Sequence, residues 1–125
     1  MKKLILISLF LLLCSSAYAT HINEIMYNPE GSDNNREFIE LYMAVPENIS
    51  GWIIADLDSN DTLELMQYSN SSYALIVEEG FNLTGINASI YSAGATIGNN
   101  LGNTADEIFL YDDNGTLVDS VYYNN

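Results

Sequence analysis

Hydrophobic and polar residues alternate over short stretches beyond about position 20, and clusters of Asn, Ser, Gly and Asp interrupt them roughly every 8–12 residues. No window keeps a 3.6-residue helical period for more than about two turns. Short alternating segments between turn clusters are typical of an all-β sandwich. We predict eight strands, at residues 22–27, 37–43, 52–57, 63–68, 73–78, 86–91, 107–111 and 117–123.

The same alternation predicts which side chains face the core. In the strand predicted at residues 37–43, the apolar side chains of Ile39, Leu41 and Met43 share one face, and the last two strands also show alternation. The only tryptophan follows a glycine at the start of a strand, a position that suits a ring packed between two sheets. The expected core residues are Ile39, Leu41, Trp52, Leu110 and Val121.

The segment Asp113-Asn114-Gly115 separates the last two strands and predicts a β-hairpin. Asn-Gly readily adopts the positive φ angles of a type I′ turn. An acid is unexpected on a strand between apolar residues, so Asp119 is predicted to cap a turn or to accept backbone N–H hydrogen bonds. The side chains expected on one face of the final strand are Leu117, Asp119, Val121 and Tyr123.

The stretch of residues 80–103 is less regular and is rich in Asn, Gly, Ala and Ser. It predicts one weak strand and a long connection. Long connections at the end of a sandwich are common places for binding sites.

The first 19 residues have the pattern of a secretory signal peptide. Lys2 and Lys3 precede an apolar run at residues 4–13, and residues 17–19 (Ala-Tyr-Ala) have the small-x-small form that signal peptidase recognises. The run of roughly 10 residues is too short to span a bilayer of ~30 Å. An uncleaved anchor or an N-terminal core helix is the alternative.

Cleavage after Ala19 would leave residues 20–125 as a single domain without cysteine, because Cys14 belongs to the signal. Arg36 would then oppose 17 acidic residues, which gives a formal charge of −16. Phosphate binding depends on Lys and Arg, so this charge argues against nucleic acid as a partner. No stable membrane span would remain, and the sequence leaves the oligomeric state open.

Five short segments occur in an order that resembles the lamin-tail domain family, an immunoglobulin-like β-sandwich. The last of the five begins at Leu101 and runs through LYDDNGTLVDSVYY, in which Asp112, Gly115 and Ser120 match the family pattern. Met43 stands where the family usually has Asn. Ala105 stands where the family has Gly, so the turn before the strand at residues 107–111 is expected to differ. The segments are INEIMYNP (22–29), EFIELY (37–42), ISGW (49–52), YALIV (73–77) and a closing stretch that begins at Leu101.

The resemblance implies a non-catalytic module of the kind attached to surface or secreted proteins, including hydrolases. Nucleic-acid binding, which some relatives show, is not expected here because of the charge. A nucleophile–base pair is also hard to assemble, since the only histidine, His21, lies beside the new N-terminus and no Cys or Lys remains. We therefore expect no enzyme activity.

Six Asn-x-Ser/Thr acceptors predict N-glycosylation, because all of them lie at or near expected turns of a secreted protein. An Asn- and Ser-rich composition without glycans is the alternative. An archaeal surface protein would explain both the signal peptide and the acceptors. The six are Asn48, Asn60, Asn70, Asn82, Asn87 and Asn114.

Asp56, Asp58, Asn60 and Asp61 form an oxygen-rich segment that is a candidate metal site for calcium, which prefers 6–8 hard oxygen ligands. The EF-hand spacing fails, and a solvated turn between two strands is the alternative. Residues 28–34 form a similar but weaker segment.

Two functions remain open. The leading hypothesis is a secreted recognition or adhesion module, located outside the cell or on its surface, that binds an extracellular protein or glycan through loops and tyrosine-bearing faces. The alternative is a glycosylated structural component of the cell envelope with a calcium-dependent contact. Tyrosine is also a good strand residue, so many of the eight tyrosines beyond residue 20 are expected to be structural.

Overall fold

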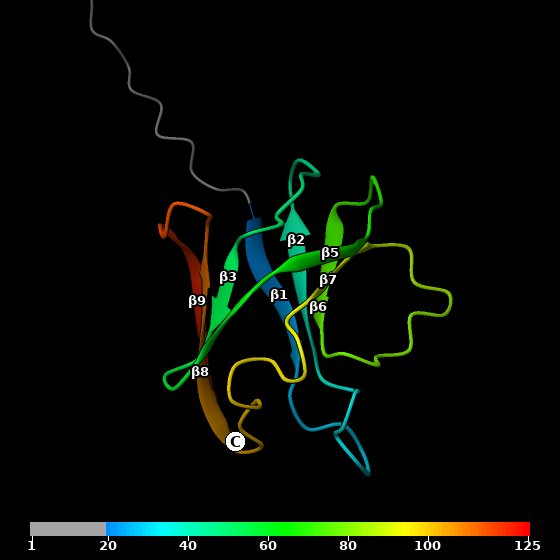
Figure 1. Ribbon diagram of the computed structural model, residues 1–125. Coiled ribbons are helices and arrows are strands. Elements are labelled where there is room, and N and C mark those ends of the chain that lie inside the picture. Colours follow the sequence, from blue (N-terminus) through cyan, green and yellow to red (C-terminus); the bar gives the residue numbers. More distant parts are fainter. Residues whose placement is uncertain (1–19) are drawn as a thin grey trace, which may run out of the picture.

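The computed structural model describes residues 20–125, which form an all-β, immunoglobulin-like sandwich of nine strands (Figure 1). The predicted signal peptide, residues 1–19, lies outside the described residues. The strands are β1 (Thr20–Met26), β2 (Phe38–Met43), β3 (Ile53–Ala55), β4 (Asn60–Thr62), β5 (Glu64–Gln67), β6 (Tyr73–Val77), β7 (Ser89–Ser92), β8 (Ala105–Tyr111) and β9 (Leu117–Asn124).

The strands form two sheets. The larger has the order β1-β2-β6-β7-β5 and the smaller the order β4-β3-β8-β9. Neighbouring strands are antiparallel except β6 and β7, which run parallel. Parallel strands need a crossover connection, and residues 78–88 provide it by passing over the outer face of the larger sheet.

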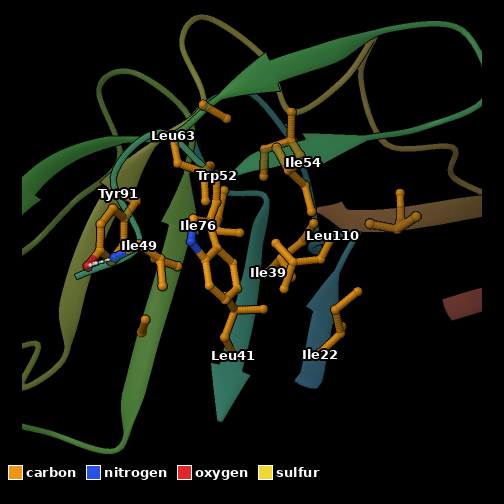
Figure 2. Close-up of a cluster of buried hydrophobic side chains, with 14 of the residues drawn as sticks. Ile22, Ile39, Leu41, Ile49, Trp52, Ile54, Leu63, Ile76, Tyr91 and Leu110 are labelled. Carbon is orange, nitrogen blue, oxygen red and sulfur yellow. Dashed lines mark hydrogen bonds between the residues drawn. The ribbon is translucent and has the colours of Figure 1, made fainter. Parts of the chain in front are cut away.

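The main core lies between the two sheets (Figure 2). Trp52 is only 6% exposed, and Ile39, Leu41 and Leu110 are fully buried, while Val121 is partly buried against the same cluster. The fully buried Tyr91 also reaches into this layer, and its hydroxyl accepts the backbone N–H of Ile49 at 3.1 Å. This bond satisfies a buried donor between the two sheets.

A second apolar cluster covers part of the outer face of the larger sheet. Leu75, Val77 and Ile90 face outward from β6 and β7, and partly buried residues of the crossover pack on them. Phe81, for example, meets Phe38 edge-on at 6.0 Å between ring centroids. The irregular stretch that begins at residue 80 is therefore anchored through its apolar residues.

Nine strands replace the eight that the sequence predicts. The additional strand is β4, which pairs with β3 at residues that we expected to form a loop. The predicted strand at residues 52–57 ends at Ala55, because Asp56 begins a turn closed by its own backbone N–H, which donates to the carbonyl oxygen of Ser59 at 3.1 Å. The predicted strand at residues 86–91 is displaced to Ser89–Ser92.

The predicted hairpin between β8 and β9 is present, but its turn is not type I′. Gly115 has a φ of 77°, whereas Asn114 does not have a positive φ. The Gly115 N–H donates to the Asp112 carbonyl oxygen at 3.0 Å, which fits a type I turn followed by a left-handed glycine. Asp112 stabilises it, since its Oδ1 accepts the N–H groups of Asn114 and Thr116 at 2.9 and 2.8 Å.

A bulge next to this turn changes one predicted face of β9. The register shifts between Leu110 and Tyr111, so that Tyr111 pairs with Leu117. Leu117 is 50% exposed, and Val118 packs against the main core in its place. The prediction for Leu117 was therefore wrong, since strict alternation cannot reveal an inserted residue.

Candidate functional site

A row of three aromatic rings crosses the outer face of the larger sheet. His21, Tyr42 and Tyr73 are direct cross-strand partners on β1, β2 and β6. The ring centroids of His21 and Tyr42 lie 5.4 Å apart, and those of Tyr42 and Tyr73 lie 5.6 Å apart. We call these three residues the aromatic row. His21 is exposed, Tyr42 is half-buried, and Tyr73 is 43% exposed.

Hydrogen-bonding groups lie beside the aromatic row. The side chain of Asn23 on β1 donates to the carboxylate of Glu40 on β2 at 2.7 Å. Glu40 is half-buried on the same face as Tyr42. Exposed rings next to a paired amide and carboxylate offer both stacking area and polar contacts, the combination that binding surfaces use.

The predicted calcium segment forms a link to a distant loop. Asp56 is buried, its Oδ1 accepts the N–H groups of Asp58 and Ser59, and its Oδ2 accepts the N–H of Asn99, all at 2.7 Å. Asp61 accepts the N–H of Gly98 through its Oδ2. These bonds fix residues 98–99 against the turn at residues 56–59. Asp56 and Asp61 therefore have a structural role.

The other two residues of the segment are more open to solvent. Asp58 and Asn60 are exposed, and Asp58 accepts a hydrogen bond from the side chain of Asn99 at 3.2 Å. A cleft of about 460 Å³ lies beside them, with Tyr111 on its wall. Within residues 20–125, no group of three or more His, Cys, Asp or Glu side chains could together hold a metal ion.

Burial raises the pKa of Asp61 above its usual value, while the N–H of Gly98 lowers it and the nearby Asp56 raises it. The desolvation of the carboxylate thus outweighs its one strong hydrogen bond.

Several other acids also accept backbone N–H groups. Asp119 on β9 accepts the Ile22 N–H on β1 at 2.8 Å, as expected for this residue, and so joins the edges of the two sheets. Asp106 accepts the Gly102 N–H at 2.9 Å and closes the turn before β8. Much of the acidic composition thus serves to fix loops and edges, since a carboxylate is a strong acceptor.

Two further acids are buried with at least one carboxylate oxygen that has no hydrogen-bond partner. Glu37 precedes β2 and is fully buried, and neither of its carboxylate oxygens has a hydrogen-bond partner. Glu78 follows β6 and is 3% exposed, and its Oε2 also has none. Burial raises the pKa of Glu78, whereas hydrogen bonds from the backbone N–H groups of Asn35, Glu37 and Arg36 lower it. Burial raises the pKa of Glu37 to about 7, and Glu78 adds to the rise, whereas the facing N–H of Leu101 opposes it. The sequence alone gave no indication of this pair.

All six predicted glycosylation acceptors are exposed, at Asn48, Asn60, Asn70, Asn82, Asn87 and Asn114. The side chain of Asn48 is held in place by hydrogen bonds from Ser50. Its Oδ1 accepts the N–H and the hydroxyl of Ser50 at 3.0 and 2.8 Å. The side-chain nitrogen, which would carry a glycan, is not used in these bonds.

None of the residues 20–125 belong to a helix that could span a bilayer. The two-sheet arrangement defines an immunoglobulin-like sandwich, and a family model described as Lamin Tail Domain matches residues 15–125. The chain belongs to the lamin-tail domain family. No curated protein and no solved structure matches it. Domains of this family often have protein-interaction or structural roles, and their fold is typically non-catalytic.

Proposed function

We propose that the protein is a secreted, non-catalytic recognition module that binds an extracellular protein or glycan at the cell surface through the aromatic row. The observation that carries this proposal is the adjacency of three rings, two exposed and one half-buried, on a sheet face that is otherwise partly covered. Tyrosine anchors contacts with both proteins and sugars, because it combines a large apolar ring with a hydroxyl group.

The surrounding surface supports a selective contact. The pair of Asn23 and Glu40 supplies hydrogen bonds next to the rings, and the strongly acidic composition disfavours anionic partners. A neutral glycan or a basic protein surface fits this chemistry. Secretion rests on the signal-peptide pattern of residues 1–19.

The competing proposal is a glycosylated structural subunit of the cell envelope. The six exposed acceptors favour it, as do the exposed apolar side chains of β5, Leu65 and Met66, on an edge strand that could meet a second copy. Such a subunit would associate with itself, whereas a recognition module would bind a different molecule.

Two measurements on the purified protein separate these proposals. Fluorescently labelled protein is titrated onto envelope preparations from the source cells, with and without prior removal of glycans, and sedimentation velocity reports self-association. Saturable binding by a monomer supports the recognition module, and its loss after glycan removal identifies a glycan partner. Concentration-dependent assembly without saturable binding would instead support the envelope subunit.

A further inference from the structure

The sheet register places Glu37, which has two unpartnered oxygens, opposite Glu78, which has one. Phe38 and Val77 are the last paired residues of β2 and β6 at this end. Glu37 precedes the first and Glu78 follows the second, so they occupy the next cross-strand position of an antiparallel pair. Side chains at directly opposite positions have Cβ atoms roughly 4.5–5.5 Å apart, and like charges there destabilise a sheet.

The surroundings add negative charge to this pair. Asp33 and Asp106 both act on Glu37 electrostatically and raise its pKa further. Both oxygens of Asp106 are engaged, since they accept the N–H groups of Gly102 and Glu107. Oδ2 of Asp33 accepts the side chain of Asn103. Asp33 lies in the loop between β1 and β2, and Asp106 lies at the start of β8. That loop and the start of β8 are at the lower end of the sandwich in Figure 1.

No basic side chain of residues 20–125 compensates this charge. Arg36 is the only Lys or Arg in that range. It is exposed, and its guanidinium donates to the carbonyl oxygens of Glu30 and Ser32 at 2.6 and 3.3 Å. His21 lies in the aromatic row, at the opposite end of β1 and β2.

Buried carboxylates need a proton, a hydrogen-bond network or a cation, because an isolated buried charge is very costly. We propose that Glu37 and Glu78 are the side-chain ligands of a divalent-cation site, for which Ca²⁺ is the best match. Ca²⁺ accepts carboxylate, backbone carbonyl and water oxygens in flexible geometry. Two acids completed by carbonyl groups and water form a weak site, with a Kd on the order of 10⁻⁴–10⁻³ M, as in extracellular modules.

This site differs from the segment of residues 56–61, whose acids Asp56 and Asp61 already bind backbone N–H groups. It also lies apart from the aromatic row, so it does not depend on the proposed function. A bound cation would connect the start of β2 to the end of β6 and hold the adjoining loops against them.

The test compares the melting temperature in millimolar CaCl2 with that in NaCl of equal ionic strength, because screening alone also stabilises a highly charged chain. Calcium at about ten times its Kd should raise the melting temperature of the wild type by roughly 5–10 °C over NaCl. Glu37→Gln should lose this difference. Glu79→Gln is the matched control, since Glu79 adjoins the pair but is exposed, and it should keep the wild-type response.

Direct binding provides a second readout if Glu37→Gln does not fold. Tyr123 lies within electrostatic range of Glu37 and can sensitise terbium luminescence. Terbium should bind with one site per chain, calcium should displace it, and Glu78→Gln should abolish the signal. Equal melting shifts in both salts would overturn the proposal. So would a calcium response that survives in Glu37→Gln and disappears in Asp58→Asn/Asp61→Asn, because the ion would then bind at residues 56–61.

Discussion

Substituting Glu37 by glutamine should remove a large part of the pH dependence of stability when divalent ions are absent. Burial raises the pKa of Glu37 from 4.5 to about 7. A group whose pKa is raised on folding stabilises the folded state fully below the unfolded pKa, and this contribution disappears as the pH rises through the folded pKa. The shift of roughly 2.5 units corresponds to roughly 3 kcal/mol, lost between about pH 4.5 and 7.

The assay is urea unfolding in EDTA at about pH 5 and pH 8, followed by the fluorescence of Trp52, which is buried in the folded state. From about pH 5 to pH 8, the free energy of unfolding of the wild type should fall by roughly 3 kcal/mol more than that of Glu37→Gln. Burial also raises the pKa values of Glu78 and Asp61, so a smaller loss in the same direction should remain in the variant.

The relevant quantity is the change in the free energy of unfolding between the two pH values. The buried glutamine amide of the variant destabilises it at both pH values, and this cost cancels in the change. Glu79→Gln should retain the wild-type dependence, since Glu79 is exposed. The reasoning about Glu37 is refuted if the wild type and Glu37→Gln lose the same free energy of unfolding between the two conditions.

Three further outcomes are expected. Trp52→Ala should cost roughly 3–5 kcal/mol in urea unfolding followed by circular dichroism, because it empties a core position; melting close to that of the wild type would mean that the ring is not a core residue. Asp119→Ala should cost roughly 1–3 kcal/mol by leaving the N–H groups of Ile22 and Ser120 without their acceptor, and an unchanged free energy of unfolding would contradict this. The secreted protein should begin at Thr20 in N-terminal sequencing, and a retained Met1 would refute the predicted cleavage.

The sequence was sufficient to predict the fold, because alternation and turn residues are local signals. The face assignment of β2 was confirmed, with Ile39 and Leu41 fully buried. The short strand β4 was missed, since three polar residues such as Asn60–Thr62 show no apolar alternation and pair only because β3 lies beside them.

The turn chemistry could be predicted only in part. Asn-Gly indicated the hairpin correctly, but the Asp112 side chain favours a type I turn by accepting two backbone N–H groups. The resulting bulge exposes Leu117 and turns Val118 toward the core. A one-residue insertion of this kind leaves no trace in a period-two pattern.

The buried pair of Glu37 and Glu78 could not be predicted from the sequence. The two residues are 41 positions apart, and only the pairing of β2 with β6 places them opposite each other. Glu37 also begins the segment EFIELY, and a charged residue at the start of a strand is common, so its burial could not be predicted from this position. The oxygen-rich segment at residues 56–61 was easier to notice because its three acids lie within six consecutive positions, although Asp56 and Asp61 accept backbone N–H groups.

The aromatic row has the same long-range origin, since Tyr42 and Tyr73 meet through the same strand pair. Its role in recognition is tested most directly by the affinity of Tyr42→Ala/Tyr73→Ala for source-cell envelopes, compared with Tyr122→Ala, which removes a 64% exposed tyrosine from β9 in the other sheet. Loss of two anchor rings should weaken binding at least about tenfold, while Tyr122→Ala binds like the wild type. Equal affinities for all three proteins, with both variants folded, would contradict recognition through this face.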